Sequence, residues 1–189
     1  ISAIGQPPQV FFDSLLAGKS GVRFSQRFDE DVSEGDSYIA AEVDFDPLAH
    51  FSKQRLGALD RSAQMGLLSA RSAIQDSALA SSIYASSRIG VYWGSAMGGI
   101  ESLINATRPM HRDGSKQMNP KTVVRIMTNA AASAIAIDHN FQGPCITFSN
   151  ACASSAISIG EAYRAISFGL LDVAVARGSD GVLRFPSIK

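Results

Sequence analysis

The sharpest change in the hydrophobic pattern of the chain falls at residues 149–153. Before it, residues 145–148 form a short apolar and β-branched run, which is typical of a buried strand. After it the residues are small and compatible with a helix, and apolar or small positions recur at helical spacing: Ala156, Ile159, Gly160, Tyr163 and Ile166. The pattern therefore predicts a strand, a sharp turn and a helix in direct succession.

Similar patterns predict further elements in the rest of the chain. The expected helices lie at residues 10–16, 60–77, 100–106 and 121–137, and the expected strands at residues 39–43, 88–94 and 171–176. Strands that alternate with helices indicate an α/β protein, and residues 145–176 predict a parallel, right-handed unit of strand, helix and strand. We therefore expect a mostly parallel or mixed sheet flanked by helices.

The predicted helices differ in how much of their surface is apolar. The helix at residues 60–77 has Asp60 as its expected N-cap. The helix at residues 121–137 is apolar over most of its girth, so we expect it to be buried, with its alanine-rich half packed against another subunit or domain. Residues 22–51 and 107–120 are polar or mixed and are predicted to be surface segments.

Composition and charge exclude several classes of protein. With 189 residues, of which 46% are hydrophobic, the chain is long and apolar enough for one sizeable core. Seventeen basic and seventeen acidic residues cancel, so no net charge draws the molecule to nucleic acid or to an anionic membrane. No apolar run approaches the length that spans a membrane. Two cysteines in one strand and turn make no disulfide framework, which predicts a reducing, cytoplasmic setting.

Cys152 is the first candidate for chemistry, because it falls at the predicted corner. A thiol at the N-terminal end of a helix meets unpaired backbone N–H groups and the positive end of the helix dipole, which favour the thiolate. The neighbouring Ala151, Ala153 and Ser154 are small enough to let a substrate carbonyl approach, and the N–H group of Cys152 could face a developing oxyanion. The alternative is that Cys152 is a small core residue, as we expect of Cys145 in the strand.

A glycine-containing turn, Ser95-Ala96-Met97-Gly98-Gly99, joins the predicted strand at residues 88–94 to a helix. Nucleotide-binding loops have the same order of elements. This turn lacks the middle glycine of the dinucleotide fingerprint, and no lysine follows as in a P-loop. We expect it instead to let backbone approach a substrate or the facing corner, and we expect no cofactor and no metal.

The block Asn-Ala-Cys-Ala-Ser-Ser at residues 150–155, with Gly143-Pro144 before it and Gly160-Glu161-Ala162 after it, resembles the active-site block of the β-ketoacyl-acyl carrier protein synthases. These are condensing enzymes of the thiolase fold. Further blocks in the family's order extend the resemblance over nearly the whole chain: Leu59-Asp60-Arg61, the turn at residues 95–99, and Asn119-Pro120 with Asn129. The sequence departs from the family pattern at Asn150, where threonine or serine is commoner, and at Arg177, where a small residue is usual.

The resemblance implies a thiolase-like fold and an acyltransferase. Cys152 would accept an acyl group from acyl carrier protein and condense it with a malonyl thioester, with loss of CO2, to give a 3-ketoacyl thioester for fatty-acid or polyketide synthesis. Met97 would line the acyl pocket, where a flexible thioether limits chain length softly, and Thr122 would lie at a second pocket position.

The resemblance also implies two kinds of partner, acyl carrier protein and a second ketosynthase subunit, in a homodimer or a heterodimer. Many members of the family contact the acidic carrier through basic residues just before the block at residues 59–61. Here that window holds only Lys53 and Arg55, outside the family's usual positions. Solvated surface charges explain these two residues at least as well as docking does.

Decarboxylation requires hydrogen-bond donors for an enolate, which the family supplies from two histidines well after the cysteine. His50, His111 and His139 do not lie in such motifs. We therefore expect residues 1–189 to be a single partial domain, the N-terminal half of a two-repeat enzyme without its first strand and its C-terminal half. The second half is expected to carry the histidines and the second oxyanion donor.

Two other functions remain open from the sequence. A non-enzymatic or inactive ketosynthase-like subunit that serves only assembly fits the missing histidines equally well. A cysteine hydrolase uses the same corner but requires a neighbouring base. Selective alkylation of Cys152 over Cys145 would distinguish both enzymes from the assembly subunit, and acyl transfer would distinguish the condensing enzyme from the hydrolase.

Overall fold

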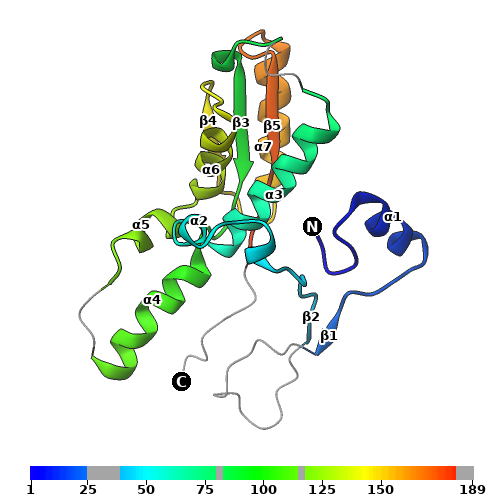
Figure 1. Ribbon diagram of the computed structural model, residues 1–189. Helices are drawn as coiled ribbons and strands as arrows, with labels where there is room; N and C mark the ends of the chain where they lie inside the picture. The colour runs from blue at the N-terminus through cyan, green and yellow to red at the C-terminus, as the bar shows by residue number, and fades with distance from the viewer. Residues whose placement is uncertain (25–38, 80–82, 115–117, 182–189) are drawn as a thin grey trace. The chain divides into compact units, whose positions relative to one another are not determined.

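The computed structural model describes residues 1–24, 39–79, 83–114 and 118–181 (Figure 1). The chain falls into two compact parts, one dominated by Ile1–Ala49 and the other formed by His50–Gly181, and each is a separate unit of structure. Among the helices within the described ranges, none is both long and apolar enough to cross a membrane.

Helix α1, at Pro8–Leu16, belongs to the first part and confirms the helix expected from the sequence. A proline in its first turn suits a helix start, because the first N–H groups of a helix have no partner within it. Gly18, just beyond its end, takes φ 63°, a left-handed value that favours glycine.

The first part also holds two very short strands. Strands β1 (Arg23–Phe24) and β2 (Ile39–Ala40) pair antiparallel, so the strand expected at residues 39–43 is confirmed but is shorter than predicted. A 3₁₀ turn, η1, covers Pro47–Ala49. Residues 25–38 of the expected surface segment lie outside the described residues.

A three-stranded parallel sheet is the centre of the second part, with the strand order β4-β3-β5. Its strands are β3 at Ile89–Gly94, β4 at Cys145–Phe148 and β5 at Val173–Gly178. Gly94 pairs with Phe148 on one side and with Gly178 on the other, so all three strands end at the same edge of the sheet. Strands and helices alternate along this part, which confirms the predicted α/β class with a parallel sheet.

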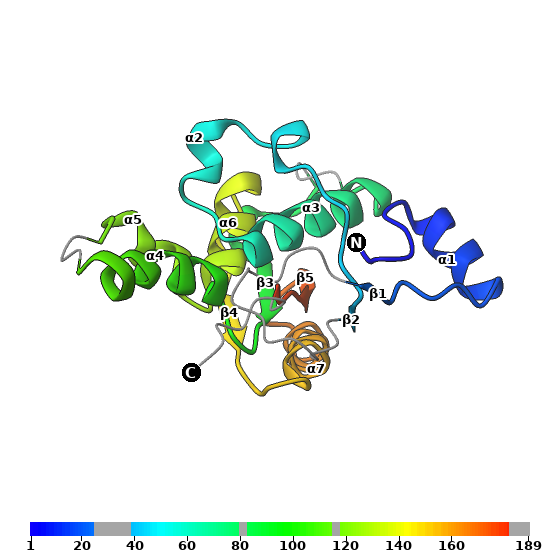
Figure 2. The ribbon, with the colours of Figure 1, turned by 90° about the horizontal axis from the view of Figure 1, so that it is seen from below.

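Helices cover both faces of this sheet (Figure 2). Helix α7 (Ser154–Ser167) packs on one face, whereas α3 (Arg61–Asp76) and α6 (Ala130–His139) pack together on the other. Successive side chains of a strand point to opposite faces, and all six residues of β3 are buried. Tyr92 faces α7 and Trp93 faces α3, so the central strand contributes to the core on both sides.

Helix α3 confirms the helix expected at residues 60–77. Asp60 is its N-cap, and the carboxylate of Asp60 accepts a hydrogen bond from the N–H group of Ser62 at 3.0 Å. Along the chain, the short helix α2 at Lys53–Leu56 precedes α3, and the 3₁₀ turn η2 at Ser86–Arg88 follows it.

The buried face of α7 differs from the apolar face that the sequence suggests. Ser158, Ala162 and Ala165 are buried, because small side chains let the helix approach the sheet closely. Ile159 and Tyr163, which belong to the apolar helical pattern, are 52% and 72% exposed. The expected helix is confirmed, but its largest apolar side chains lie on a face that is exposed to solvent.

The sequence predicts a buried strand at residues 145–148. The strand is confirmed, but the prediction that it is buried is wrong. Strand β4 forms there, but it is an edge strand that pairs with β3 on one side. Cys145 and Ile146 are therefore exposed, although their residue types are usual in a core. The prediction that Cys145 is a buried core residue is wrong for the same reason.

The helix expected at residues 121–137 is in fact two helices, α5 (Lys121–Ile126) and α6. The chain between them becomes extended at Met127, with ψ 139°, where the backbone of Gly98 packs closely against it. Burial also differs from the prediction. The alanine-rich part of α6 is mostly buried, whereas both valines of α5 are exposed.

Helix α4, at Ile100–Asp113, is longer than the helix expected at residues 100–106. The surface loop predicted at residues 107–120 is therefore wrong over its first half. Proline removes an N–H donor and usually ends a helical pattern, but α4 continues past Pro109. It ends at Gly114, which takes a left-handed φ of 65°.

Candidate active site

The candidate site lies at the edge of the sheet where the three parallel strands end. Strand β3 leads into residues 95–99, which we call the 95–99 turn, and β4 leads into residues 149–153, which we call the elbow. The N–H groups of Ser95 and Ser179 donate to carbonyl groups at the ends of β4 and β3, both at 3.0 Å. These bonds hold the turn, the elbow and the loop after β5 together, at the edge where α/β proteins commonly bind ligands.

The elbow has a strained backbone that a buried serine holds in place. Ala151 takes φ 49°, a left-handed value that costs a non-glycine residue about 1–3 kcal/mol. The hydroxyl group of Ser154 accepts a hydrogen bond from Asn150 N–H at 2.8 Å and donates one to Ala151 O at 2.6 Å. Ser154 is only 3% exposed. It therefore stabilises the backbone of the elbow through these two hydrogen bonds.

Cys152 is exposed on this elbow, two residues before α7 begins. It lies at the N-terminal end of α7, as predicted, where unpaired N–H groups and the helix dipole favour negative charge. Two glycines let α7 lie this close to the strand ends. A Cβ atom on Gly94 would overlap the backbone of Ser154, and one on Gly178 would lie 3.0 Å from the Cβ atom of Ser155 in α7.

The carboxylate of Asp180, in the loop after β5, holds the 95–99 turn. It accepts hydrogen bonds from the N–H groups of Ala96 and Met97 and from the hydroxyl group of Ser95, each at 3.0 Å. Consecutive backbone N–H groups of this kind bind the anion in phosphate loops. Here the protein's own carboxylate occupies them, so these donors are not available to the phosphate of a nucleotide.

Met97 and Cys152 lie at the same edge of the sheet. The hydroxyl group of Ser149, the first residue of the elbow, donates a hydrogen bond to Ala96 O at 3.4 Å, so the turn and the elbow are in contact. Met97 is 46% exposed. The structure thus places the predicted pocket residue on a turn that touches the elbow.

Thr122, the second predicted pocket residue, is buried in α5. The end of α5 lies against the 95–99 turn, because the backbone of Gly99 packs closely on the carbonyl group of Arg125. Thr122 is about one helical turn from this contact. The backbone N–H group of Thr122 donates a hydrogen bond to Asn119 O at 2.8 Å, and among the hydrogen bonds of the described residues none joins Thr122 to Cys152.

Cys145 has different surroundings from Cys152. Partial burial of its thiol raises the pKa of Cys145, and a hydrogen bond with Ser133 opposes this rise by a smaller amount. A thiol with a raised pKa has less of the reactive thiolate near neutral pH. Cys145 is therefore exposed to solvent but poorly suited to act as a nucleophile.

Arg55 and His139 both lie close to Asp138, near the C-terminal end of α6. Arg55 lies 3.7 Å from Asp138 and also donates to a carbonyl group of α6, so its charge has partners within the chain. His139 stacks on Phe141, and its Nε2 atom lies 3.8 Å from Asp138. Within the described part of the chain, no group of three or more His, Cys, Asp or Glu side chains is arranged to hold a metal ion.

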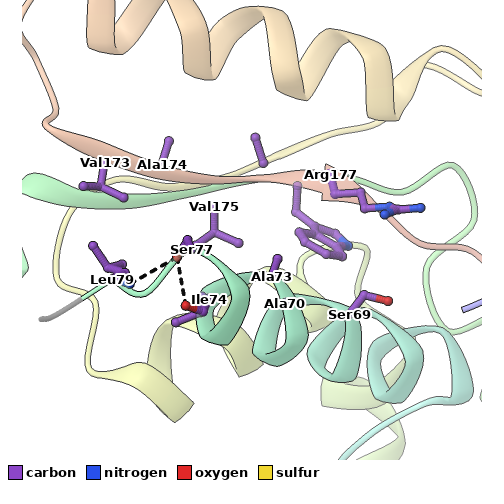
Figure 3. Close-up of a pocket in the computed structure, with 12 residues that line it drawn as sticks. Ser69, Ala70, Ala73, Ile74, Ser77, Leu79, Val173, Ala174, Val175 and Arg177 are labelled. Carbon is purple, nitrogen blue, oxygen red and sulfur yellow. Dashed lines mark hydrogen bonds between the residues drawn. The ribbon is translucent and has the colours of Figure 1, made fainter. Parts of the chain in front are cut away.

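A groove of about 340 Å³ lies between α3 and β5, on the face of the sheet opposite α7 (Figure 3). Its lining is mostly apolar, and Arg177 is one of the residues that line it. The carbonyl group of Arg177 accepts a hydrogen bond from Ser158 of α7 at 2.9 Å. The side chain of Arg177 lines the groove, on the face of the sheet opposite α7.

Two residues that shape the candidate site, Asp180 and Ser154, carry weak signals in the sequence. Asp180 follows a predicted strand, and parallel strands end at one edge of a sheet, so the topology suggests that Asp180 lies near the 95–99 turn. The topology suggests no such role for Ser154. Ser154 is one of several serines around Cys152, and nothing in its residue type shows that its hydroxyl group is buried.

Solved structures confirm the class of protein that these strands and helices define. The ishigamide ketosynthase/chain length factor has a TM-score of 0.87 and 27% sequence identity, over 97% of this chain and 46% of that chain. A β-ketoacyl synthase from Burkholderia phymatum STM815 has a TM-score of 0.75 and 26% identity, over 90% of this chain and 42% of that one. The chain therefore has the α/β fold of the ketosynthases, the thiolase-like fold that was expected.

Residues 1–185 match the family described as the N-terminal domain of β-ketoacyl synthase, and the chain belongs to this family. It is 32% identical over 181 residues to 3-oxoacyl-[acyl-carrier-protein] synthase 2 of Coxiella burnetii (strain RSA 493 / Nine Mile phase I). It is 29% identical over 180 residues to the protein of the same name from Vibrio cholerae serotype O1 (strain ATCC 39315 / El Tor Inaba N16961). Each match covers 95% of this chain but 43% of the relative, so the chain spans less than half the length of these curated relatives.

Proposed function

We propose that this chain carries the nucleophile of a condensing acyltransferase. Cys152 accepts an acyl group from acyl carrier protein, and the acyl-enzyme condenses with a malonyl thioester to give a 3-ketoacyl thioester and CO2, for fatty-acid or polyketide synthesis. The observation that supports this most is an exposed cysteine on a strained elbow at the N-terminal end of α7, in a chain of the β-ketoacyl synthase family.

In the first step, the thiolate of Cys152 attacks the carbonyl carbon of the acyl thioester. The carbonyl electrons move onto oxygen, and in this proposal the N–H group of Cys152 stabilises that oxyanion. The carbonyl group then re-forms and expels the carrier's thiolate, which takes up a proton. The acyl group remains on Cys152, and we propose that Met97 and Thr122 line the pocket for its chain.

In the second step, loss of CO2 from the malonyl thioester produces an enolate carbon that attacks the acyl group and releases the thiolate of Cys152. The enolate requires hydrogen-bond donors. Because the chain spans less than half the length of its curated relatives, we propose that it is a single partial domain. The remainder of a longer protein would supply the enolate donors and the second oxyanion donor, and the reaction needs no cofactor.

The proposed partners are acyl carrier protein and a second ketosynthase subunit. The similar enzymes of C. burnetii and V. cholerae are named for acyl carrier protein, and the similar ishigamide structure contains a ketosynthase and a chain length factor. The edge strand β4 and the exposed valines of α5 offer surface that a second subunit can cover, in a homodimer or a heterodimer. The two exposed free thiols fit a reducing compartment such as the cytoplasm.

The experiment that tests the function is 3-ketoacyl formation by the intact protein from acyl-carrier and malonyl-carrier thioesters. Cys152→Ala should abolish the product, because it removes the atom that holds the acyl group. The matched control Cys145→Ala should keep activity near that of the wild type. Release of free acid without ketoacyl product would favour a cysteine hydrolase, and no turnover of either kind would favour a non-enzymatic assembly subunit.

A further inference from the structure

Asp180 makes contacts that the chemistry at Cys152 does not require. Its carboxylate accepts hydrogen bonds from three successive residues of the 95–99 turn, Ser95, Ala96 and Met97, at 3.0–3.1 Å. Hydrogen bonds to an ionised carboxylate are roughly twice as strong as those between neutral groups. A single side chain therefore fixes most of the turn.

The loop that carries Asp180 is itself attached to the core of the second part. The N–H group of Ser179 donates to Gly94 O at 3.0 Å, and the hydroxyl group of Ser179 accepts a hydrogen bond from the indole N–H of Trp93 at 3.1 Å. Trp93 is 1% exposed. The carboxylate is thus held at a defined position relative to the sheet.

The turn that Asp180 holds lies between the elbow and α5. On one side Ser149 of the elbow donates to Ala96 O, and on the other side Gly98 and Gly99 pack closely on backbone at the end of α5. The N–H group of Met97 is one of the donors to Asp180, and the Met97 side chain is about half exposed. The position of this side chain beside the elbow therefore depends on Asp180.

We propose that Asp180 is a positioning residue that fixes the 95–99 turn beside Cys152 and thereby determines which acyl chain lengths the enzyme accepts. This inference rests on the proposed acyl transfer to Cys152 and on Met97 as a pocket residue. Asp180 and Met97 are both exposed, so water can take the place of the carboxylate when Asp180 is replaced. The loss of overall stability is then small, and the loss of a fixed turn changes selectivity.

The test measures acyl transfer by the intact protein from carrier thioesters of butyryl, octanoyl and palmitoyl groups. Asp180→Ala removes the acceptor oxygens, and Asp180→Glu keeps a carboxylate. Asp172→Ala is the matched control, because Asp172 lies just before β5, at the opposite end of the sheet, where its carboxylate accepts two hydrogen bonds from Arg88. The rate of Cys152 alkylation by iodoacetamide is measured in every variant, since it reports on the elbow alone.

In Asp180→Ala, we expect the ratio of kcat/KM between the best and the worst acyl group to fall about tenfold, the size of effect that one methylene group has in a shaped pocket. Cys152 alkylation should not change. Asp180→Glu should restore much of the ratio, and Asp172→Ala should keep it. If Asp180→Ala does not fold, Asp180→Asn, which keeps one acceptor oxygen, is expected to change the ratio in the same direction.

An equal loss for every acyl group, or an unchanged ratio, would overturn the positioning role and leave the proposed function standing. Slower alkylation of Cys152 in Asp180→Ala would also overturn it, because Asp180 would then act on the elbow and not on the pocket. A wild-type protein that forms no acyl-Cys152 would contradict the proposed function itself, and the positioning role with it.

Discussion

The two cysteines of the chain are both exposed, yet their thiols meet different surroundings. Cys145 lies on the edge strand β4, where partial burial of the thiol raises its pKa. Cys152 lies on the strained elbow at the N-terminal end of α7. Exposure alone therefore does not decide which thiol reacts, and the backbone around each thiol has to be considered.

We expect iodoacetamide near neutral pH to modify Cys152 about tenfold faster than Cys145, or more, because thiolate and not thiol is the nucleophile. The rates can be followed by mass spectrometry of the tryptic peptide at residues 126–164, which holds both cysteines and whose fragmentation separates them. Denaturant should remove the difference, since it depends on the fold. Equal rates in the folded protein would mean that the elbow does not activate Cys152.

Replacement of Met97 by phenylalanine should shorten the longest acyl chain that the intact enzyme accepts. An aromatic ring cannot fold aside as a thioether can, so the pocket would become shorter by roughly the depth of the ring. The chain-length profile of product formation measures this effect. Met110→Phe, at a methionine of α4 that is 39% exposed, is the control and should leave the profile unchanged. A Met97→Phe enzyme with the wild-type profile would place Met97 outside the pocket.

The order of strands and helices in the second part follows from the local sequence pattern. The ends of some helices and the solvent exposure of some strands do not. The strands at β3 and β4 and the helices α3 and α7 lie where the hydrophobic period predicts them. The break between α5 and α6 depends on the backbone of Gly98 and Gly99, which is distant in sequence. The exposure of β4 depends on which strand lies beside it. Tertiary contacts decide these features, so a local pattern cannot contain them.

In the candidate site too, some features follow from the local sequence pattern and others depend on contacts between distant residues. The place of Cys152 between a strand and a helix is visible in the sequence, because the period changes there. The carboxylate of Asp180 acts on residues that lie more than eighty positions earlier in the chain. The contacts of Asp180 depend on the strand order of the sheet, which sequence alone did not define.

Helices α3 and α6 are joined by an ion pair whose contribution to stability should depend on pH. Arg71 donates two hydrogen bonds to Asp138, at 2.8 and 2.9 Å, and this contact holds the pKa of Asp138 below its usual range. Asp138→Asn should lower the free energy of unfolding at neutral pH by about 1 kcal/mol, since the pair is partly open to solvent. Urea unfolding of the intact protein measures the difference.

Because folded Asp138 binds its proton less tightly than the unfolded chain does, the stabilisation is fully present above the unfolded pKa of about 3.9 and is lost as the pH falls through the lower folded pKa. The difference between wild type and Asp138→Asn should therefore shrink in acid. Asp76→Asn, at an exposed position of α3, is the control and should change the free energy of unfolding at neutral pH less than Asp138→Asn does. A difference that stays constant into strong acid would contradict the role of this pair.

The described structure leaves large apolar side chains uncovered in its second part. Ile159, Tyr163 and Phe168 are exposed on and just after α7, and the edge strand β4 exposes Ile146. Large apolar faces of this kind usually mark contacts with other parts of a protein or with partners. The chain also spans less than half the length of its curated relatives. Both observations support the proposal that the activity belongs to a longer, assembled enzyme.

The proposed mechanism requires one covalent bond, between an acyl group and the sulfur of Cys152. The most direct measurement is to incubate the intact protein with an acyl-carrier thioester and no malonyl substrate, so that the acyl-enzyme accumulates, and to locate the added mass by fragmentation of the tryptic peptide. We expect the acyl group on Cys152 and not on Cys145, with none on the peptide of Cys152→Ala. Formation of 3-ketoacyl product by a protein that carries the acyl group on any other residue, or on none, would contradict the mechanism.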